Sequence, residues 1–188
     1  SVVLWNLPRH QMHYRLPSFS TPVWSLTFSP DGQGFATAGD YTIKLWDTHQ
    51  GICCRSYLSQ AHPVRCLTFS ERGNSLLTGH GDHTLRLWDI ARVAVLTACP
   101  NQLTGHPGAV RAISVAPQGE WFASSAEDQT IRIWHGTRRI CQQVIPSLPS
   151  TVSALTFHPG GNLLVSADED GSVMVWDLHS GARVQTLA

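Results

Sequence analysis

A tryptophan followed by aspartate or another polar residue recurs along this chain at a nearly constant interval. The pairs are Trp5-Asn6, Trp46-Asp47, Trp88-Asp89, Trp134-His135 and Trp176-Asp177, so consecutive tryptophans lie 41, 42, 46 and 42 residues apart. A fixed period of this length is typical of an array of similar supersecondary units. We therefore expect a stack of small repeated units along the 188 residues.

Each period contains four short apolar segments separated by turn residues. The first segments are "VRCLTF" (64–69), "VRAISV" (110–115) and "VSALTF" (152–157), each followed by a turn with a glycine. The third segment ends at the tryptophan, a weaker fourth follows, and no stretch has helical periodicity. A four-stranded unit cannot bury its apolar faces alone, and radial stacking of such units forms a propeller. The predicted fold class is all-β.

The recurring Trp-Asp, the upstream aspartate and the Gly-His-like segment before the first strand resemble the WD-repeat family of β-propellers. This resemblance covers essentially the whole chain. It implies blades of four antiparallel strands in a propeller that most often has seven blades. We expect a partial blade at 1–18 and full blades at 19–60, 61–104, 105–147 and 148–188. The partial blade implies a segment of a longer protein, with the missing strands supplied by the rest of that chain or, alternatively, by a second arc.

An aspartate lies six residues before each full-unit tryptophan, and a serine or threonine lies nine or ten before it. The resemblance implies a buried network of His, Ser/Thr, Asp and Trp in each blade. One predicted network is His106, Ser124, Asp128 and Trp134, and a second is His62, Thr78, Asp82 and Trp88. The outer blades lack the histidine and retain Thr37, Asp40 and Trp46, and Ser166, Asp170 and Trp176. Ser-His-Asp is also the composition of a hydrolase triad. Its recurrence at the repeat spacing favours the structural interpretation.

In the first strand of a unit the apolar residues are spaced three and then two, as in Val64, Leu67 and Phe69. This slip predicts a β-bulge after the leading valine. In the family, the bulge positions line the narrow face of the propeller, beside the residue before the network aspartate. The predicted partner-binding residues are therefore Trp24, Arg65, Arg111, Glu127 and Glu169. The alternative for Trp24 is packing over the central channel.

Composition disfavours several other classes of function. The formal net charge is zero, which gives no long-range field to attract nucleic acid or an anionic membrane. The longest apolar runs are too short to span a bilayer, and no leader-like segment is visible. Five cysteines, an odd number with no C-x-x-C pair, indicate reduced, half-buried thiols in a cytoplasmic or nuclear protein: Cys53, Cys54, Cys66, Cys99 and Cys141.

No catalytic constellation or cofactor motif is present, so we expect no enzyme activity and no cofactor. His80 and His83 flank Asp82 in one turn and offer a possible metal site. Because Asp82 already belongs to a network, we interpret both histidines as solvated turn residues and expect no metal. Lys44, Arg86 and Arg132 each lie two residues before a tryptophan. A basic residue there is ordinary in the family, so nucleic-acid binding is disfavoured.

The predicted function is a non-enzymatic scaffold or adaptor that binds proteins or peptides of unknown identity through the propeller rim and narrow face. One alternative is a purely architectural propeller segment completed by further repeats or another chain. Another is an accessory array of a larger enzyme.

Overall fold

The computed structural model describes residues 1–16, 19, 21–39, 41–59, 62–90, 102–146 and 148–187, and every regular element among them is a β-strand. The described part of the chain contains no helix with the length and apolar character that a membrane crossing requires. A half blade consists of β1 (Val3–Asn6) and β2 (Gln11–Arg15). The first full blade contains β3 (Val23–Phe28), β4 (Gly34–Gly39), β5 (Thr42–Asp47) and β6 (Cys53–Leu58).

The other three blades repeat this pattern. The second contains β7 (Val64–Phe69), β8 (Ser75–His80), β9 (Leu85–Asp89) and β10 (Gln102–Leu103). The third contains β11 (Val110–Val115), β12 (Trp121–Ala126), β13 (Ile131–His135) and β14 (Ile140–Ile145). The fourth contains β15 (Val152–Phe157), β16 (Leu163–Asp168), β17 (Val173–Asp177) and β18 (Arg183–Leu187). Each blade is a four-stranded antiparallel sheet in chain order, so the all-β prediction with four-stranded antiparallel blades is confirmed.

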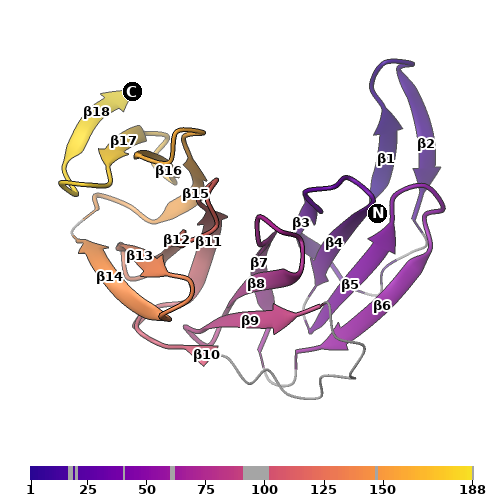
Figure 1. Cartoon of the computed structure of the whole chain (residues 1–188), viewed down its shortest axis with the longest axis horizontal. Coiled ribbons are helices and arrows are strands. Elements are labelled where there is room, and N and C mark those ends of the chain that lie inside the picture. Colours follow the sequence, from indigo (N-terminus) through magenta and orange to yellow (C-terminus); the bar gives the residue numbers. More distant parts are fainter. Residues whose placement is uncertain are drawn as a thin grey trace.

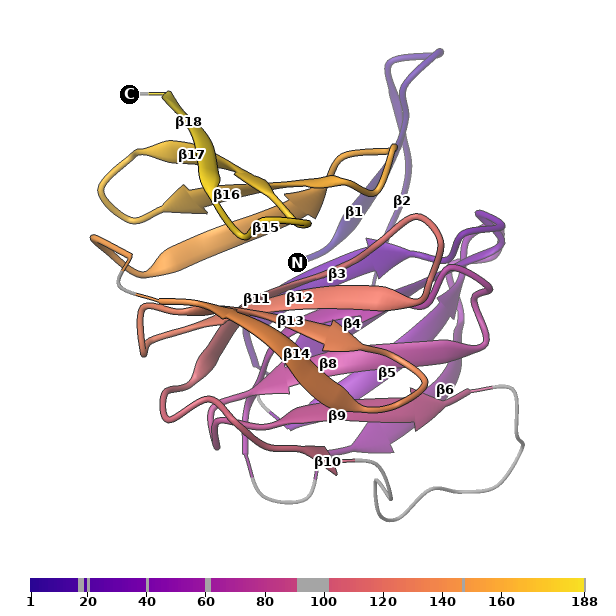
Figure 2. The ribbon, with the colours of Figure 1, turned by 60° about the vertical axis from the view of Figure 1, so that its left-hand side comes forward.

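The blades follow one another around an open arc, with β1 and β2 at one end and β18 at the other (Figure 1). Consecutive inner strands β3, β7, β11 and β15 contact one another, and the neighbouring strands β11 and β15 can be followed in Figure 2. The turn after each inner strand closes through a glycine with positive φ. In the second blade this is Gly73, with a φ of 68°, and its N–H donates to the carbonyl of Ser70. Only glycine adopts this conformation without strain, which explains the recurring turn glycine.

The core lies between blades rather than within them, because strand residues alternate between the two faces of a sheet. Val64, Leu67 and Phe69 of β7 pack toward the first blade, whereas Cys66 packs toward the third. Blades approach closely at Gly79, where an added Cβ would lie 2.5 Å from Val110 Cγ1. Burial between blades therefore accounts for the stacking that the apolar faces require.

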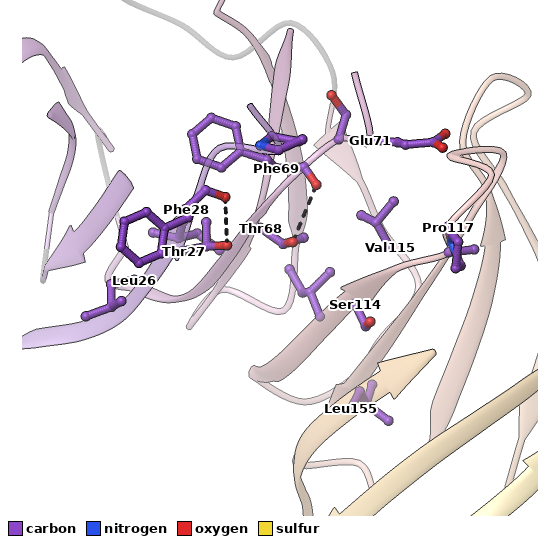
Figure 3. A pocket seen from close by; sticks show the side chains of 15 residues that line it. Leu26, Thr27, Phe28, Thr68, Phe69, Glu71, Ser114, Val115, Pro117 and Leu155 are labelled. Atoms are coloured by element: carbon purple, nitrogen blue, oxygen red, sulfur yellow. Dashed lines mark hydrogen bonds between the residues drawn. The ribbon is translucent and has the colours of Figure 1, made fainter. Parts of the chain in front are cut away.

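The half blade does not cover the face of β3 that is equivalent to the face of β7 packed against the first blade. Leu67 and Phe69 are 5% and 8% exposed, but Leu26 and Phe28, at the same positions of β3, are 53% and 49% exposed. The inner strands border a hollow of about 390 Å³, toward which Leu26, Thr68, Ser114 and Leu155 project (Figure 3). Neither of the two inner strands that would cover Leu26 and Phe28 is present among the described residues of the half blade.

Candidate functional site

The inner strands share a register shift directly after their leading valine. It falls between Val23 and Ser25, between Val64 and Cys66, between Val110 and Ala112, and between Val152 and Ala154. The bulge predicted from the apolar spacing is therefore confirmed in all four blades. The bulged residues are Trp24, Arg65, Arg111 and Ser153. Because a bulged residue has no partner in the ladder, its side chain can be redirected without a change in the sheet.

One hydrogen bond recurs in every full blade. The indole N–H of Trp46, Trp88, Trp134 and Trp176 donates to the hydroxyl of Thr37, Thr78, Ser124 and Ser166, at 2.9, 2.9, 2.8 and 2.9 Å respectively. All four hydroxyl residues are buried. A buried indole N–H needs an acceptor, and the second strand of each blade supplies it.

In the third blade the hydroxyl belongs to a longer chain of bonds. His106 Nε2 lies 2.7 Å from Ser124 Oγ, and His106 Nδ1 lies 2.8 Å from Asp128 Oδ2. With the proton on Nδ1, the imidazole donates to the carboxylate and accepts from the serine, which in turn accepts from Trp134. Burial lowers the pKa of His106, although the bond to Asp128 opposes this effect. The histidine is therefore kept neutral.

The second blade uses a different histidine from the one expected. His80 is fully buried, with Nε2 2.7 Å from Thr78 Oγ1 and Nδ1 3.3 Å from Ser59 Oγ. His62, the predicted member, has a half-exposed side chain whose Nε2 approaches Asp82 only to 4.0 Å. The expectations that His62 binds the hydroxyl and that His80 is solvated are therefore wrong. Thr78 and His80 are two residues apart on one strand and share a face, so this alternation was the signal that the spacing argument missed.

In the second blade Asp82 takes a guanidinium in place of an imidazole. Arg86 Nη2 lies 2.5 Å from Asp82 Oδ2, and the Thr84 hydroxyl donates to Oδ1 at 2.6 Å. Burial raises the pKa of Asp82, but the bond from Thr84 and the charge of Arg86 outweigh it and lower the pKa. Burial, reinforced by Arg86, lowers the pKa of His80 to about 4. In the second blade, therefore, His80 binds the hydroxyl and Arg86 binds the carboxylate, whereas His106 makes both contacts in the third blade.

The turn around Asp82 does not direct its two histidines to a common point. His83 is exposed, while His80 points to Thr78 and Ser59. Among the described residues, no three His, Cys, Asp or Glu side chains are arranged to hold a metal ion.

The outer blades retain the hydroxyl–indole bond without an imidazole. In the fourth blade Asp170 is exposed, and the buried carboxylate is that of Asp168, whose Oδ1 accepts the N–H groups of Asp170 and Ser172 at 3.1 and 2.9 Å. The prediction that Asp170 belongs to a buried network is therefore wrong, because Asp168 is on the inward face of β16. Asp40 of the first blade lies outside the described residues.

The basic residues two positions before the tryptophans are half-buried rather than forming an exposed stripe. Lys44 lies over the rings of Phe19 and Trp46, at 5.5 and 5.8 Å from their centroids. Arg86 binds Asp82, and Arg132 lies beside Cys141.

The cysteines differ in exposure. Cys66 is buried, which raises its pKa to about 12. Cys141 is half-buried as expected, whereas Cys53 and Cys54 are exposed, and all four are free thiols. Cys99 lies outside the described residues.

Exposed and half-buried side chains gather where the inner strands begin. Arg65 lies over the Trp24 ring, 5.1 Å from its centroid, and half of Trp24 is exposed. Arg111 Nη2 lies 2.8 Å from Glu127 Oε1, because the pairing of Val110 with Ala126 brings the ends of β11 and β12 together. Glu169 occupies the corresponding exposed position after β16. We call Trp24, Arg65, Arg111, Glu127 and Glu169 the rim.

The repeated sheets and the recurrent indole–hydroxyl bond define a WD-repeat β-propeller segment. The family model "WD domain, G-beta repeat" matches residues 11–47, 51–89, 97–135 and 140–177. This chain belongs to the WD40 repeat family.

Two curated relatives share the repeats. The chain is 27% identical over 140 residues to "Protein groucho" of Drosophila melanogaster, in an alignment that covers 72% of this chain and 18% of the relative. It is 33% identical over 131 residues to "Cell division cycle 20.1, cofactor of APC complex" of Arabidopsis thaliana, covering 66% of this chain and 28% of the relative. The matched part of the chain thus spans less than a third of the length of either relative.

Proposed function

We propose that this chain is a non-enzymatic scaffold or adaptor module that binds proteins or peptides through the rim and the narrow face of the propeller. The observation that carries the proposal is the division of polar residues between two places. The hydroxyls and His106 bind other side chains inside the blades. The rim residues, by contrast, are exposed apart from half-buried Arg65, and they lie where the inner strands begin and the neighbouring second strands end. Tryptophan and arginine are enriched among residues that dominate binding energy.

The non-enzymatic part of the proposal is supported by the third-blade network. Ser124, His106 and Asp128 have the composition of a hydrolase triad. The Ser124 hydroxyl is fully buried and accepts the indole N–H of Trp134, so a substrate carbonyl has no route to it. The same hydroxyl–indole bond in three other blades supports a structural role.

The relatives support an adaptor role at a coarser level. One of them is named as a cofactor of a larger complex. We extend this role to the present chain as part of the proposal. We also propose that it acts inside the cell, because the described cysteines are unpaired thiols, which persist in reducing compartments.

A charge-reversal experiment tests the proposal. The double variant Arg65→Glu/Arg111→Glu of the full-length protein is compared with Arg72→Glu/Arg138→Glu, whose exposed arginines are in turns at the opposite ends of the strands. Affinity purification with quantitative mass spectrometry is expected to show loss of partners only for the rim variant, with thermal unfolding unchanged in both. Retention of every partner by the folded rim variant would overturn the proposal.

The architectural alternative is favoured by a different observation. Leu26 and Phe28 present an apolar face that is buried at the equivalent positions of the second blade. Such a face favours cover by further strands, so the segment also serves to build a larger propeller. Under this alternative alone, the rim variant would keep all partners.

A further inference from the structure

Two repeat positions set the charge of the rim in the second, third and fourth blades. The first is the bulged residue of the inner strand, which is Arg65, Arg111 or Ser153. The second is the residue directly after the next strand, which is Gly81, Glu127 or Glu169. Antiparallel pairing places these two positions of a blade side by side, as the Arg111–Glu127 pair demonstrates.

The third blade is internally neutral at the rim. Arg111 and Glu127 are joined at 2.8 Å, and their side chains are 39% and 47% exposed. An exposed ion pair contributes little to stability. It does, however, neutralise both charges at this point of the rim.

The second blade has the arginine without the carboxylate. Gly81 stands where the third blade has Glu127, and no carboxylate among the described residues pairs with Arg65. The Arg65 guanidinium instead lies over Trp24. This cation–π contact keeps the guanidinium beside the exposed indole, and guanidinium N–H groups can bind a carboxylate in bidentate fashion.

The fourth blade has the carboxylate without the cation. Ser153 stands where the third blade has Arg111, and its hydroxyl donates to the carbonyl of Ala167. The backbone N–H of Glu169 donates to the carbonyl of Thr151, while its side chain is exposed. Within the described ranges, no Lys, Arg or His forms an ion pair with Glu169.

We propose that the rim binds an extended peptide in one direction, with an acidic residue on Arg65 and Trp24 and a basic residue on Glu169. The peptide crosses the neutral Arg111–Glu127 pair between them. This inference rests on the proposed function and specifies its partner. A cation and an anion on separate blades, neither of which has an ion-pair partner in the part of the chain that the structure describes, fix the orientation of a bound segment, because the reversed peptide places like charges together.

The test starts from a phage-displayed library of random linear peptides, selected on the full-length protein. Selected peptides are expected to carry one Asp or Glu and one Lys or Arg in a constant order and at a constant spacing. Each is then synthesised with a fluorophore, and its Kd is measured by fluorescence anisotropy.

Two variants supply the missing charges. Gly81→Glu gives Arg65 the carboxylate that Arg111 already has, and Ser153→Arg gives Glu169 a cation. The first is sterically allowed, since among the described residues an added Cβ at Gly81 meets only Pro63 Cδ, at an ordinary van der Waals distance of 3.7 Å. Each variant is expected to raise Kd about tenfold. In Gly81→Glu, replacing the acidic peptide residue with Ala should have no further effect.

The outcomes separate the two proposals. Peptides that require Trp24 but show no constant charge order, or that bind both variants with unchanged Kd, overturn the directional inference and leave the proposed function standing. Failure to select any peptide whose binding requires the rim overturns both. Thermal unfolding of each variant checks that the blades remain intact.

Discussion

The imidazole of His80 lies 2.7 Å from the hydroxyl of Thr78, two residues earlier on the same strand, and this hydroxyl also accepts the indole N–H of Trp88. The chain of bonds continues through Ser59 to the backbone carbonyl of His62. In the third blade the equivalent chain ends on the carboxylate of Asp128. In two neighbouring blades, therefore, the hydroxyl that accepts the indole N–H is held by an imidazole, but the imidazole comes from a different position and has a different second partner.

Replacing His80 with alanine should destabilise the protein by about 2–4 kcal/mol, because it leaves a cavity and removes a partner from two buried hydroxyls. His62→Ala is the matched control and should change stability by less than about 0.5 kcal/mol, since its side chain is half-exposed. Urea unfolding measures both. Equal effects would show that the second blade does not depend on His80.

Asp128→Ala should cost about 2–3 kcal/mol, because it removes the carboxylate that lies 2.8 Å from Nδ1 of buried His106 and leaves this N–H only the longer 3.4 Å contact with Thr130 Oγ1. Asp170→Ala, at the same spacing from its tryptophan, should cost less than about 0.5 kcal/mol because Asp170 is exposed. The free energies of unfolding of the two variants distinguish a network acid from a solvated one. A larger loss for Asp170→Ala would contradict this assignment.

Stability should fall as the pH decreases from 6.5 toward 4. His80 has a pKa of about 4 in the folded protein against 6.5 in the unfolded chain, so the unfolded chain binds the proton first. The stabilisation is complete above pH 6.5 and is lost as the pH approaches the folded value, and His106 acts in the same direction. Urea unfolding across this window should show a shallower dependence for His80→Gln. Exposed His83→Gln should retain the wild-type slope.

Hydrogen exchange should be slower in β12 and β13 than in β16 and β17. The third blade has an imidazole and a carboxylate behind its indole, whereas the fourth blade has only the hydroxyl. Local opening of the fourth blade therefore breaks fewer side-chain bonds. Peptide-resolved exchange followed by mass spectrometry measures the difference, and uniform protection would contradict it.

Gly79→Ala should destabilise the interface between the second and third blades by about 1–3 kcal/mol, because the new methyl would overlap Val110 and Cys66. Gly81→Ala, two residues on, has room for a methyl and should be neutral or slightly stabilising. Thermal unfolding of the pair provides the comparison. Tolerance of Gly79→Ala would mean that the two blades can separate slightly without loss.

The strands, turn glycines and bulges could be predicted because they depend on local spacing, and the hydroxyl–indole partners were chosen correctly because antiparallel register brings them together. Which of His62 and His80 binds the hydroxyl depends on which imidazole is buried when the blades pack. The only local sign of this in the sequence is that Thr78 and His80 lie two residues apart and therefore on the same face of the strand. For the same reason, counting back from Trp176 selected Asp170, although Asp168 faces inward. The Arg111–Glu127 pair also needed the register of β11 and β12.

Under the proposed function, the bulge at the start of each inner strand places the binding residues outside the regular pairing of the scaffold. Trp24, Arg65, Arg111 and Ser153 are chemically unlike one another, yet the strands that carry them keep a common pairing scheme. If these residues bind partners as proposed, mutation at these sites would change which partner is bound while the hydrophobic contacts between the blades stay as they are. A graft of all four side chains, together with the neighbouring turn residues, onto another WD-repeat protein should transfer the specificity with little loss of folding yield.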